Sequence, residues 1–311
     1  LFTPGTASLL KENIMGLAPC FGRGDDGYKK IEKRVLNYLK KIPAHKSIVT
    51  LQGSASLALE ILIHNFLYGN VLVVDTGIYS DRIKLISTFS KKTFKNIKNI
   101  RSINWKQINE FSGRFDWIFA CPTETSIGLK VPMQDLYKLK KRCNAKLALD
   151  ATASIGLEKD HSFCDVMAYS SCKGLFGLTG GSFISYNIKP NNLIESFYLN
   201  INSHAEHKMT GPYHTILSLE KVISSYNEFK YAVIVNKKRI MRMMSENIQY
   251  PKKNQPLLCT YISKKLFSKD KRQILYKTRA NIDGSVVCHL GEVDLKKKAK
   301  GDILKKLYYE N

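Results

Sequence analysis

The chain has 311 residues, of which 44% are apolar and 24% are charged. This composition is typical of a globular protein of one or two domains, and it excludes wholesale disorder. Basic residues outnumber acidic ones by 49 to 26, giving a formal net charge of +23 that favours anionic partners. The lysines are spread along the chain and no nucleic-acid-binding motif is present, so we do not expect nucleic acid as a partner. A small anionic substrate is compatible with the charge.

The seven cysteines give no sign of a metal site, because no two of them have the CxxC spacing of zinc ligands. Their odd number and the size of the chain argue against a disulfide framework, and we expect a reducing, cytoplasmic location. No apolar run approaches the roughly 18–20 residues needed to cross a bilayer. The longest, over 57–67, is interrupted by Glu60, His64 and Asn65, so we expect no membrane association.

The first 26 residues are rich in glycine and proline and are predicted to form an arm over the body of the protein. Apolar residues at helical spacing then predict helices, and short apolar runs predict strands buried on both faces. Strands that alternate with helices favour a mostly parallel sheet covered by helices, the α/β class. The predicted helices span 28–41, 54–67, 79–89 and 133–142, and the predicted strands span 71–74, 117–120, 147–149, 166–169 and 182–185.

The C-terminal part has a different pattern, which predicts a small α+β domain. Two long helical stretches are followed by a tail in which strands and helices alternate. The stretches are helices over 215–229 and 231–247, strands over 258–262 and 285–290, and helices over 269–277 and 295–309. We therefore expect an arm (1–26), a large domain (27–230), and a linking helix with a small C-terminal domain (231–311).

Three segments have side chains suited to binding or catalysis. They lie beyond the carboxyl ends of strands, where a parallel sheet binds its ligands. The segment 52–56 places two hydroxyls and free amides at a helix start, which suits a phosphate, although serine is also an ordinary helix cap. Asp150 ends a buried strand, where a carboxylate needs a hydrogen-bonding or cationic partner. Lys173 follows the next strand and faces the crevice, where an amine can attack a carbonyl group.

Together, these three features match the needs of pyridoxal phosphate. The lysine forms a Schiff base with the aldehyde, and the carboxylate keeps the ring nitrogen protonated so that the ring accepts electrons. Thr210 is placed to add a hydroxyl to the phosphate site.

The sequence resembles the fold-type I, class V aminotransferases along nearly its whole length. Among them it is most similar to the 2-aminoethylphosphonate–pyruvate transaminases. The segments that carry the resemblance are TPG at 3–5, LQGSASLALE at 51–60, GIYSDR at 77–82, TETSIG at 123–128, DATASIG at 150–156, SSCK at 170–173 and TGPYHT at 210–215.

The resemblance implies two catalytic residues, Lys173 and Asp150. Lys173 would carry the Schiff base and then move a proton between the amino acid carbon and the cofactor carbon. Asp150 would pair with the pyridinium nitrogen.

The resemblance also implies how the cofactor is held. Its phosphate would lie against Ser54, Ala55 and Ser56, and Tyr79 would lie on the face of the ring. Thr125 would be near the ring hydroxyl. Thr210 would reach the phosphate of the neighbouring subunit, which implies a homodimer.

The sequence departs from the family pattern at the position that grips the acidic end of the substrate. Relatives place an arginine in a strand of the small domain, whereas the corresponding stretch here, 286–293, contains none. His289 or Val286 takes its position, depending on the alignment. Arg279 lies nearby in sequence, and Arg23 lies in the N-terminal arm, so Arg23, Arg279 and His289 are candidate substrate ligands.

Smaller departures are Ala55 and Ser56, which replace the commoner glycine and threonine, and Cys172, which replaces a polar amide.

The function implied is transfer of an amino group from 2-aminoethylphosphonate, or a similar small anionic amine, to pyruvate in phosphonate metabolism. Three alternatives stay open at this point. One is a transaminase of the alanine–glyoxylate or serine–pyruvate type, and another is a lyase or desulfurase of the same fold. The third, from another class, is a catalytically inactive nucleic-acid-binding protein on this fold.

Overall fold

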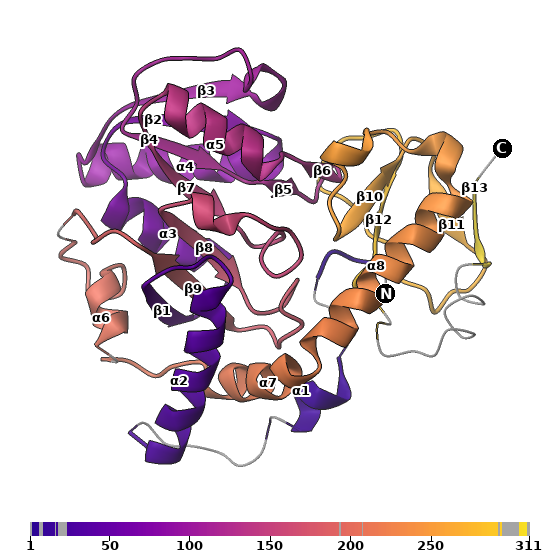
Figure 1. The fold of residues 1–311 in the computed structure, drawn as a ribbon, viewed down its shortest axis with the longest axis horizontal. Coiled ribbons are helices and arrows are strands. Elements are labelled where there is room, and N and C mark those ends of the chain that lie inside the picture. The colour runs from indigo at the N-terminus through magenta and orange to yellow at the C-terminus, as the bar shows by residue number, and fades with distance from the viewer. Residues whose placement is uncertain are drawn as a thin grey trace.

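The large part of the molecule is built around a seven-stranded sheet, which the computed structural model shows in Figure 1. In spatial order, its strands are β1 (Ser47–Gln52), β9 (Gly181–Tyr186), β8 (Val166–Ser170), β7 (Lys146–Asp150), β4 (Trp117–Ala120), β2 (Gly69–Asp75) and β3 (Ile97–Asn104). Strand β9 pairs antiparallel with both of its neighbours, and the other adjacent pairs are parallel. All the strands except β9 therefore end at one edge of the sheet, where its ligands are expected. The structure describes residues 2–5, 9–15, 17, 24–192, 194–206, 208–291, 293 and 305–309.

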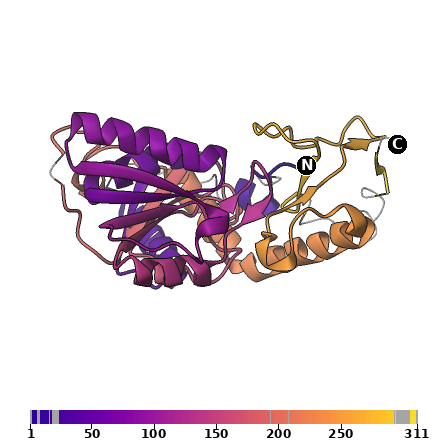
Figure 2. The same ribbon diagram turned by 90° about the horizontal axis from the view of Figure 1, so that it is seen from above.

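Helices cover both faces of this sheet, as Figure 2 shows. They are α2 (Asp26–Lys41), α3 (Ala55–Phe66), α4 (Ile78–Thr93), α5 (Met133–Arg142) and α6 (Ile201–Ala205). Successive side chains of a strand alternate between its faces. Along β2, Leu72 and Val74 accordingly join an apolar cluster with α2 and α5, whereas Val71 and Val73 join one with α3 and α4.

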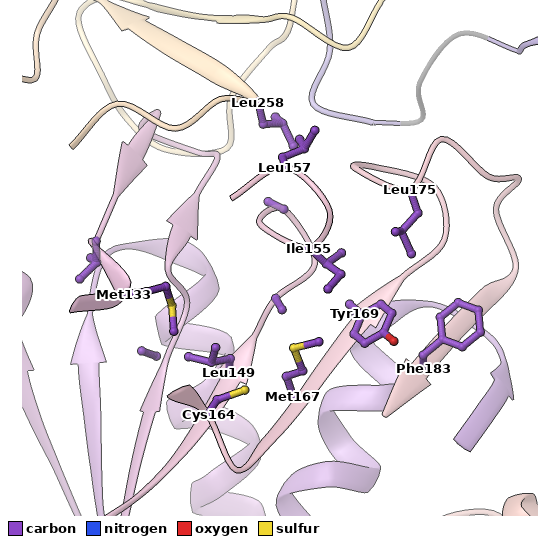
Figure 3. Close-up of a cluster of buried hydrophobic side chains, with 14 of the residues drawn as sticks. Met133, Leu149, Ile155, Leu157, Cys164, Met167, Tyr169, Leu175, Phe183 and Leu258 are labelled. Carbon is purple, nitrogen blue, oxygen red and sulfur yellow. The ribbon is translucent and has the colours of Figure 1, made fainter. Parts of the chain in front are cut away.

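The buried strands predicted from apolar runs are present, because each of them packs on both faces. All four residues of β4 and all five of β8 are buried. Figure 3 shows part of this core, in which Leu149, Met167 and Tyr169 from neighbouring strands lie together. The Tyr169 and Phe183 rings stack with their centroids 5.4 Å apart. The mostly parallel sheet covered by helices confirms the predicted α/β fold.

The sequence did not predict the two edge strands, β1 and β3. An edge strand is paired on one side only, so it does not need a continuous apolar run. Strand β3 exposes Lys98, Asn99 and Arg101, and only Val49 and Leu51 of β1 are buried.

A smaller C-terminal part follows the two helices α7 (Tyr213–Ser224) and α8 (Tyr226–Met243). Strands β10 (Cys259–Ile262) and β12 (Ser285–Cys288) pair antiparallel, as do β11 (Leu266–Ser268) and β13 (Leu307–Tyr309). Helix α8 runs from beside the large sheet to these strands, so the predicted boundary at 230/231 falls inside it (Figure 1). No helix in the described part of the chain is both long and apolar enough to span a membrane.

Shorter elements complete the chain. They are α1 (Lys11–Met15), the hairpin strands β5 (Thr123–Glu124) and β6 (Leu129–Lys130), and the 3-10 helices η1 (Trp105–Gln107), η2 (His161–Phe163), η3 (Ser245–Asn247) and η4 (Lys252–Asn254).

Two helices predicted in the tail are corrected by the structure. Residues 269–277 form turns and extended chain. The Asp270 carboxylate accepts a hydrogen bond from the Arg272 amide at 3.0 Å, a local turn that competes with a helix, and Leu275 forms a β-bridge with Phe2. The end of the helix predicted over 295–309 is instead strand β13, and 295–304 lie outside the described residues.

Candidate active site

A cavity of about 540 Å³ lies beyond the carboxyl ends of the central strands. It collects residues from the turn before α3, the start of α4, the ends of β4, β7 and β8, and the small domain. They are Gly53, Ser54, Ala55, Ser56, Tyr79, Arg82, Cys121, Thr123, Thr125, Asp150, Thr152, Ala153, Ser170, Cys172, Lys173, Thr179, Gly180, Gly181 and Arg279. A second cavity of about 680 Å³, in the small domain, is lined by none of the predicted site residues.

The two predicted catalytic residues line the first cavity from adjacent strands. Asp150 is the last residue of β7 and pairs in register with Ala168 of β8, and Lys173 follows the end of β8. Asp150 is 4% exposed, and its carboxylate accepts hydrogen bonds from the Thr152 hydroxyl and from the Thr152 amide at 3.0 Å. Neither Asp150 nor Lys173 forms an ion pair within the described residues. The carboxylate and the amine thus share one cavity without neutralising each other.

The start of α3 forms a cradle of polar groups on the cavity wall. Ser54 caps this helix with an extended backbone, and its hydroxyl makes no capping hydrogen bond. The first amides of a helix have no partner within the helix, and its dipole favours an anion there. Arg82 Nη1 donates a hydrogen bond of 3.0 Å to Ser56 Oγ, which brings a cation to the same place.

Tyr79 is held over the cavity by a buried carboxylate. Its amide donates to Glu124 Oε2 at 3.0 Å, while the Ser126 amide and hydroxyl bond to the other carboxylate oxygen. Burial raises the pKa of Glu124, against the opposing effect of these hydrogen bonds. Lys173 Nζ lies 5.5 Å from the centre of the Tyr79 ring, so the amine faces the aromatic ring across the cavity.

Two threonine hydroxyls in the cavity wall lack partners. The side-chain oxygens of Thr123 and Thr125 are buried and make no hydrogen bond within the described protein. An unpaired buried hydroxyl costs about 1–3 kcal/mol, so a ligand group that pairs with it is favoured. These residues fit pyridoxal phosphate, which brings a ring hydroxyl, a ring nitrogen and a phosphate to the cavity.

Of the three residues predicted to bind the substrate, the structure places one in the cavity wall. Arg279 lines the cavity. His289 is 1% exposed, and its ring nitrogens pair with the Leu257 carbonyl at 2.8 Å and the Thr260 hydroxyl at 3.1 Å. Burial lowers the pKa of His289 to about 3, so it is a neutral core residue, and it does not line the cavity. Arg23 lies outside the described residues.

Thr210, the predicted partner-facing residue, does not line this cavity. It is exposed just before α7, on the surface of the chain. This position leaves its hydroxyl accessible to a second molecule.

The segment that carries Arg279 is tied to the loop between β5 and β6 and to the N-terminal residues. The Thr278 hydroxyl donates to the Ser126 carbonyl, and the Ala280 amide donates to the Thr278 hydroxyl at 3.1 Å. A few residues earlier, the Phe2 amide donates to the Ile274 carbonyl at 2.8 Å. The N-terminal residues thus help to place the arginine.

The N-terminal residues also pack against Lys173, and the absence of a side chain at Gly5 allows this close contact. Gly5 has φ +148°, and a Cβ added to it would lie 2.8 Å from Lys173 Cγ. We expect Gly5→Ala to displace the lysine stem and to weaken binding of pyridoxal phosphate by about tenfold or more, the effect of 1.4 kcal/mol. Spectrophotometric titration of the protein with the cofactor measures this change.

Gly24→Ala is the matched control for this prediction. Gly24 also has a positive φ, +92°, but a Cβ there would meet no atom of the described residues within 4 Å. Equal cofactor affinity in the Gly5 and Gly24 variants would show that contact with Lys173 has no effect.

Sequence reasoning missed Arg82 as a site residue. The available signal was its position three residues after Tyr79 on a predicted helix, because side chains at i and i+3 lie on one face. Its guanidinium carbon lies 5.1 Å from the centre of the Tyr79 ring.

Comparison with known sequences finds transaminases. A 2-aminoethylphosphonate–pyruvate transaminase of Pseudomonas aeruginosa is 24% identical over 255 residues, which cover 73% of this chain and 68% of that enzyme. No family profile matches the sequence.

Comparison with solved structures finds the same architecture. An alanine–glyoxylate aminotransferase from Nostoc sp. gives a TM-score of 0.80 at 13% identity, covering 98% of this chain and 93% of that one. An aspartate aminotransferase of subgroup IV from Thermus thermophilus gives 0.79 at 15% identity, covering 98% and 97%. The chain therefore has the fold of the fold-type I pyridoxal-phosphate-dependent aminotransferases, and over 73% of its length it is similar in sequence to a 2-aminoethylphosphonate–pyruvate transaminase.

Proposed function

We propose that this protein is a pyridoxal-phosphate-dependent aminotransferase that moves an amino group from a small anionic amine, by preference 2-aminoethylphosphonate, to pyruvate. The observation that carries the proposal is the placement of Lys173 and Asp150. They line one cavity, form no ion pair with each other, and share the wall with a cradle suited to an anion. A structural ion pair would have brought the two side chains together instead.

Pyridoxal phosphate, when bound, supplies an aldehyde that bonds to amines and a cationic ring that accepts electrons. The chain's own residues support this chemistry in separate roles. Lys173 Nζ is the base that takes a proton from the substrate carbon and returns it at the next step. The Asp150 carboxylate holds a proton on the ring nitrogen, and its bonds to Thr152 fix its orientation. The Tyr79 ring offers an apolar face to an aromatic ligand.

Arg279 is the proposed partner of the acidic group of the substrate. It is the cation that the small domain contributes to the cavity wall in the described structure, and a guanidinium can grip a carboxylate or phosphonate with two parallel hydrogen bonds. We expect Arg279→Gln to raise KM for the amine by about 10–100-fold, the effect of 1.5–3 kcal/mol for hydrogen bonds to a charged group. Steady-state kinetics against amine concentration measure this.

Arg272→Gln is the control, because Arg272 lies in the same segment but is exposed and bonds to Asp270. If the two variants have the same KM, Arg279 does not bind the substrate.

A panel of donors tests the substrate class. The purified protein is supplied with pyridoxal phosphate and with 2-aminoethylphosphonate, alanine or serine as donor, and pyruvate or glyoxylate as acceptor. We expect 2-aminoethylphosphonate and pyruvate to give alanine. If serine or alanine reacts and the phosphonate gives no product, the donor assignment is wrong and the alanine–glyoxylate or serine–pyruvate type replaces it. If the protein transaminates no donor and binds duplex DNA with a steep salt dependence, the proposal that it is an enzyme is wrong.

The proposal includes a homodimer, with Thr210 of one subunit reaching the cofactor of the other. It is supported by the exposure of Thr210 and of apolar side chains around α1, namely Leu9, Ile14 and Met15. The six cysteines in the described part of the chain are free thiols, which suits the proposed cytoplasmic location. Analytical ultracentrifugation at micromolar concentration tests the dimer.

A further inference from the structure

We infer that Arg82 binds the phosphate of the cofactor and is the cation of the cradle at the start of α3. This inference rests on the proposed function and adds to it a residue that the resemblance did not assign. Arg82 comes from the first turns of α4, whereas the cradle comes from α3. Its hydrogen bond to Ser56 Oγ, 3.0 Å long, joins the two helices at the cavity.

The charge of Arg82 has no acidic partner among the described residues. The two carboxylates near the start of α4 are both engaged by another cation, since Lys84 Nζ lies 2.6 Å from Asp81 and 3.3 Å from Asp75. Arg82 instead contacts an uncharged hydroxyl and the face of an aromatic ring. A half-buried guanidinium without a counter-charge favours an anion beside it.

The geometry leaves donors free for that anion. A guanidinium has five N–H donors in a fixed fork, and the bond to Ser56 uses one of them. Because the Ser56 oxygen accepts this bond, its own hydrogen remains available for a phosphate oxygen. The Tyr79 ring, 5.1 Å from the guanidinium carbon, restrains the side chain on its other side.

The test compares two ligands that differ only in the phosphate. Equilibrium binding of pyridoxal phosphate and of pyridoxal is measured by absorbance titration of the cofactor-free protein and of its Arg82→Gln and Arg82→Lys variants. We expect Arg82→Gln to weaken pyridoxal phosphate by about 10–100-fold and to leave pyridoxal unchanged, as for a lost hydrogen bond to a charged group. Arg82→Lys keeps the charge and loses the fork, so its affinity should be intermediate. Inorganic phosphate should compete with the cofactor less well in Arg82→Gln than in the parent protein.

Arg101→Gln is the matched control. Arg101 also stacks on an aromatic ring, with its guanidinium carbon 5.0 Å from the centre of Phe111, but it lies on β3 outside the cavity. Its substitution should change neither affinity.

Two outcomes would overturn the inference in distinguishable ways. If Arg82→Gln weakens pyridoxal and pyridoxal phosphate equally, or neither of them, Arg82 supports the cavity wall at most and does not bind phosphate. If the parent protein binds neither pyridoxal phosphate nor pyridoxal, the proposed function is wrong, and the role proposed for Arg82 is wrong for the same reason.

Discussion

Replacing Lys173 by alanine is expected to abolish the visible absorbance of the protein mixed with pyridoxal phosphate. Lys173 is the lysine of the cavity wall in the described structure, so no other amine there can bond to the aldehyde. Transamination should fall by at least about 10²–10⁴-fold, the usual contribution of a positioned acid–base group. Absorbance scans and steady-state rates measure both effects.

Borohydride reduction makes the assignment specific to one residue. Reduction of the parent protein with bound cofactor, followed by peptide mass analysis, should place the added mass on the peptide that contains Lys173. Lys92→Ala is a control on the surface of α4, and it should retain both the band and the rate. A visible band that survives in Lys173→Ala would remove this residue from the mechanism. Partial recovery of the rate with added small amines would support the loss of a base.

Replacing Asp150 by asparagine is expected to lower turnover by about 10–100-fold while the protein remains folded. The amide cannot hold a proton on the ring nitrogen as a carboxylate does, and a hydrogen bond to a charged group is worth about 1.5–3 kcal/mol. The position is prepared for a negative charge, because Thr152 donates two hydrogen bonds to the carboxylate. Steady-state kinetics with saturating cofactor measure the loss.

Asp165→Asn provides the comparison at the opposite edge of the same strands. Asp165 precedes β8, accepts a hydrogen bond from the Leu147 amide at 2.7 Å and pairs with Lys140 at 2.7 Å. Its substitution should lower the free energy of unfolding and leave turnover nearly unchanged. Equal turnover in the parent protein and in Asp150→Asn would contradict the role given to Asp150.

The core of the fold was predictable because the spacing of apolar residues along its strands and helices matches the positions that are buried in the structure. Strand β8 is buried at every position, and α5 has the predicted bounds because its apolar residues lie on one face. Edge strand β3 has no such pattern, because only its residues Ile97 and Ile103 are buried. The turn at 269–277 depends on Asp270 bonding to its neighbours and on Leu275 meeting Phe2, a contact between the two ends of the chain.

The candidate site was predictable where residues follow strands and unpredictable where tertiary contacts decide. Lys173 and Asp150 follow adjacent parallel strands, so one edge of the sheet brings them together. His289 looked available in the sequence, yet the pairing of β10 with β12 places Thr260 and Leu257 against its two ring nitrogens. The spacing of Arg82 from Tyr79 was a signal in the sequence, but its bond to Ser56 depends on the packing of α4 beside α3.

The reversed direction of β9 determines how freely the reactive amine can move. A parallel continuation from β8 would need a long crossover, whereas the antiparallel step lets residues 171–180 return directly to the same edge. This short return is fastened at both ends, since the Ser171 amide donates to the Gly181 carbonyl at 3.0 Å and the Gly177 amide to the Ser171 carbonyl at 2.9 Å. In the proposed reaction, we therefore expect the amine to adjust by rotation within the lysine side chain or by movement of the small domain, because these hydrogen bonds hold the backbone beside it.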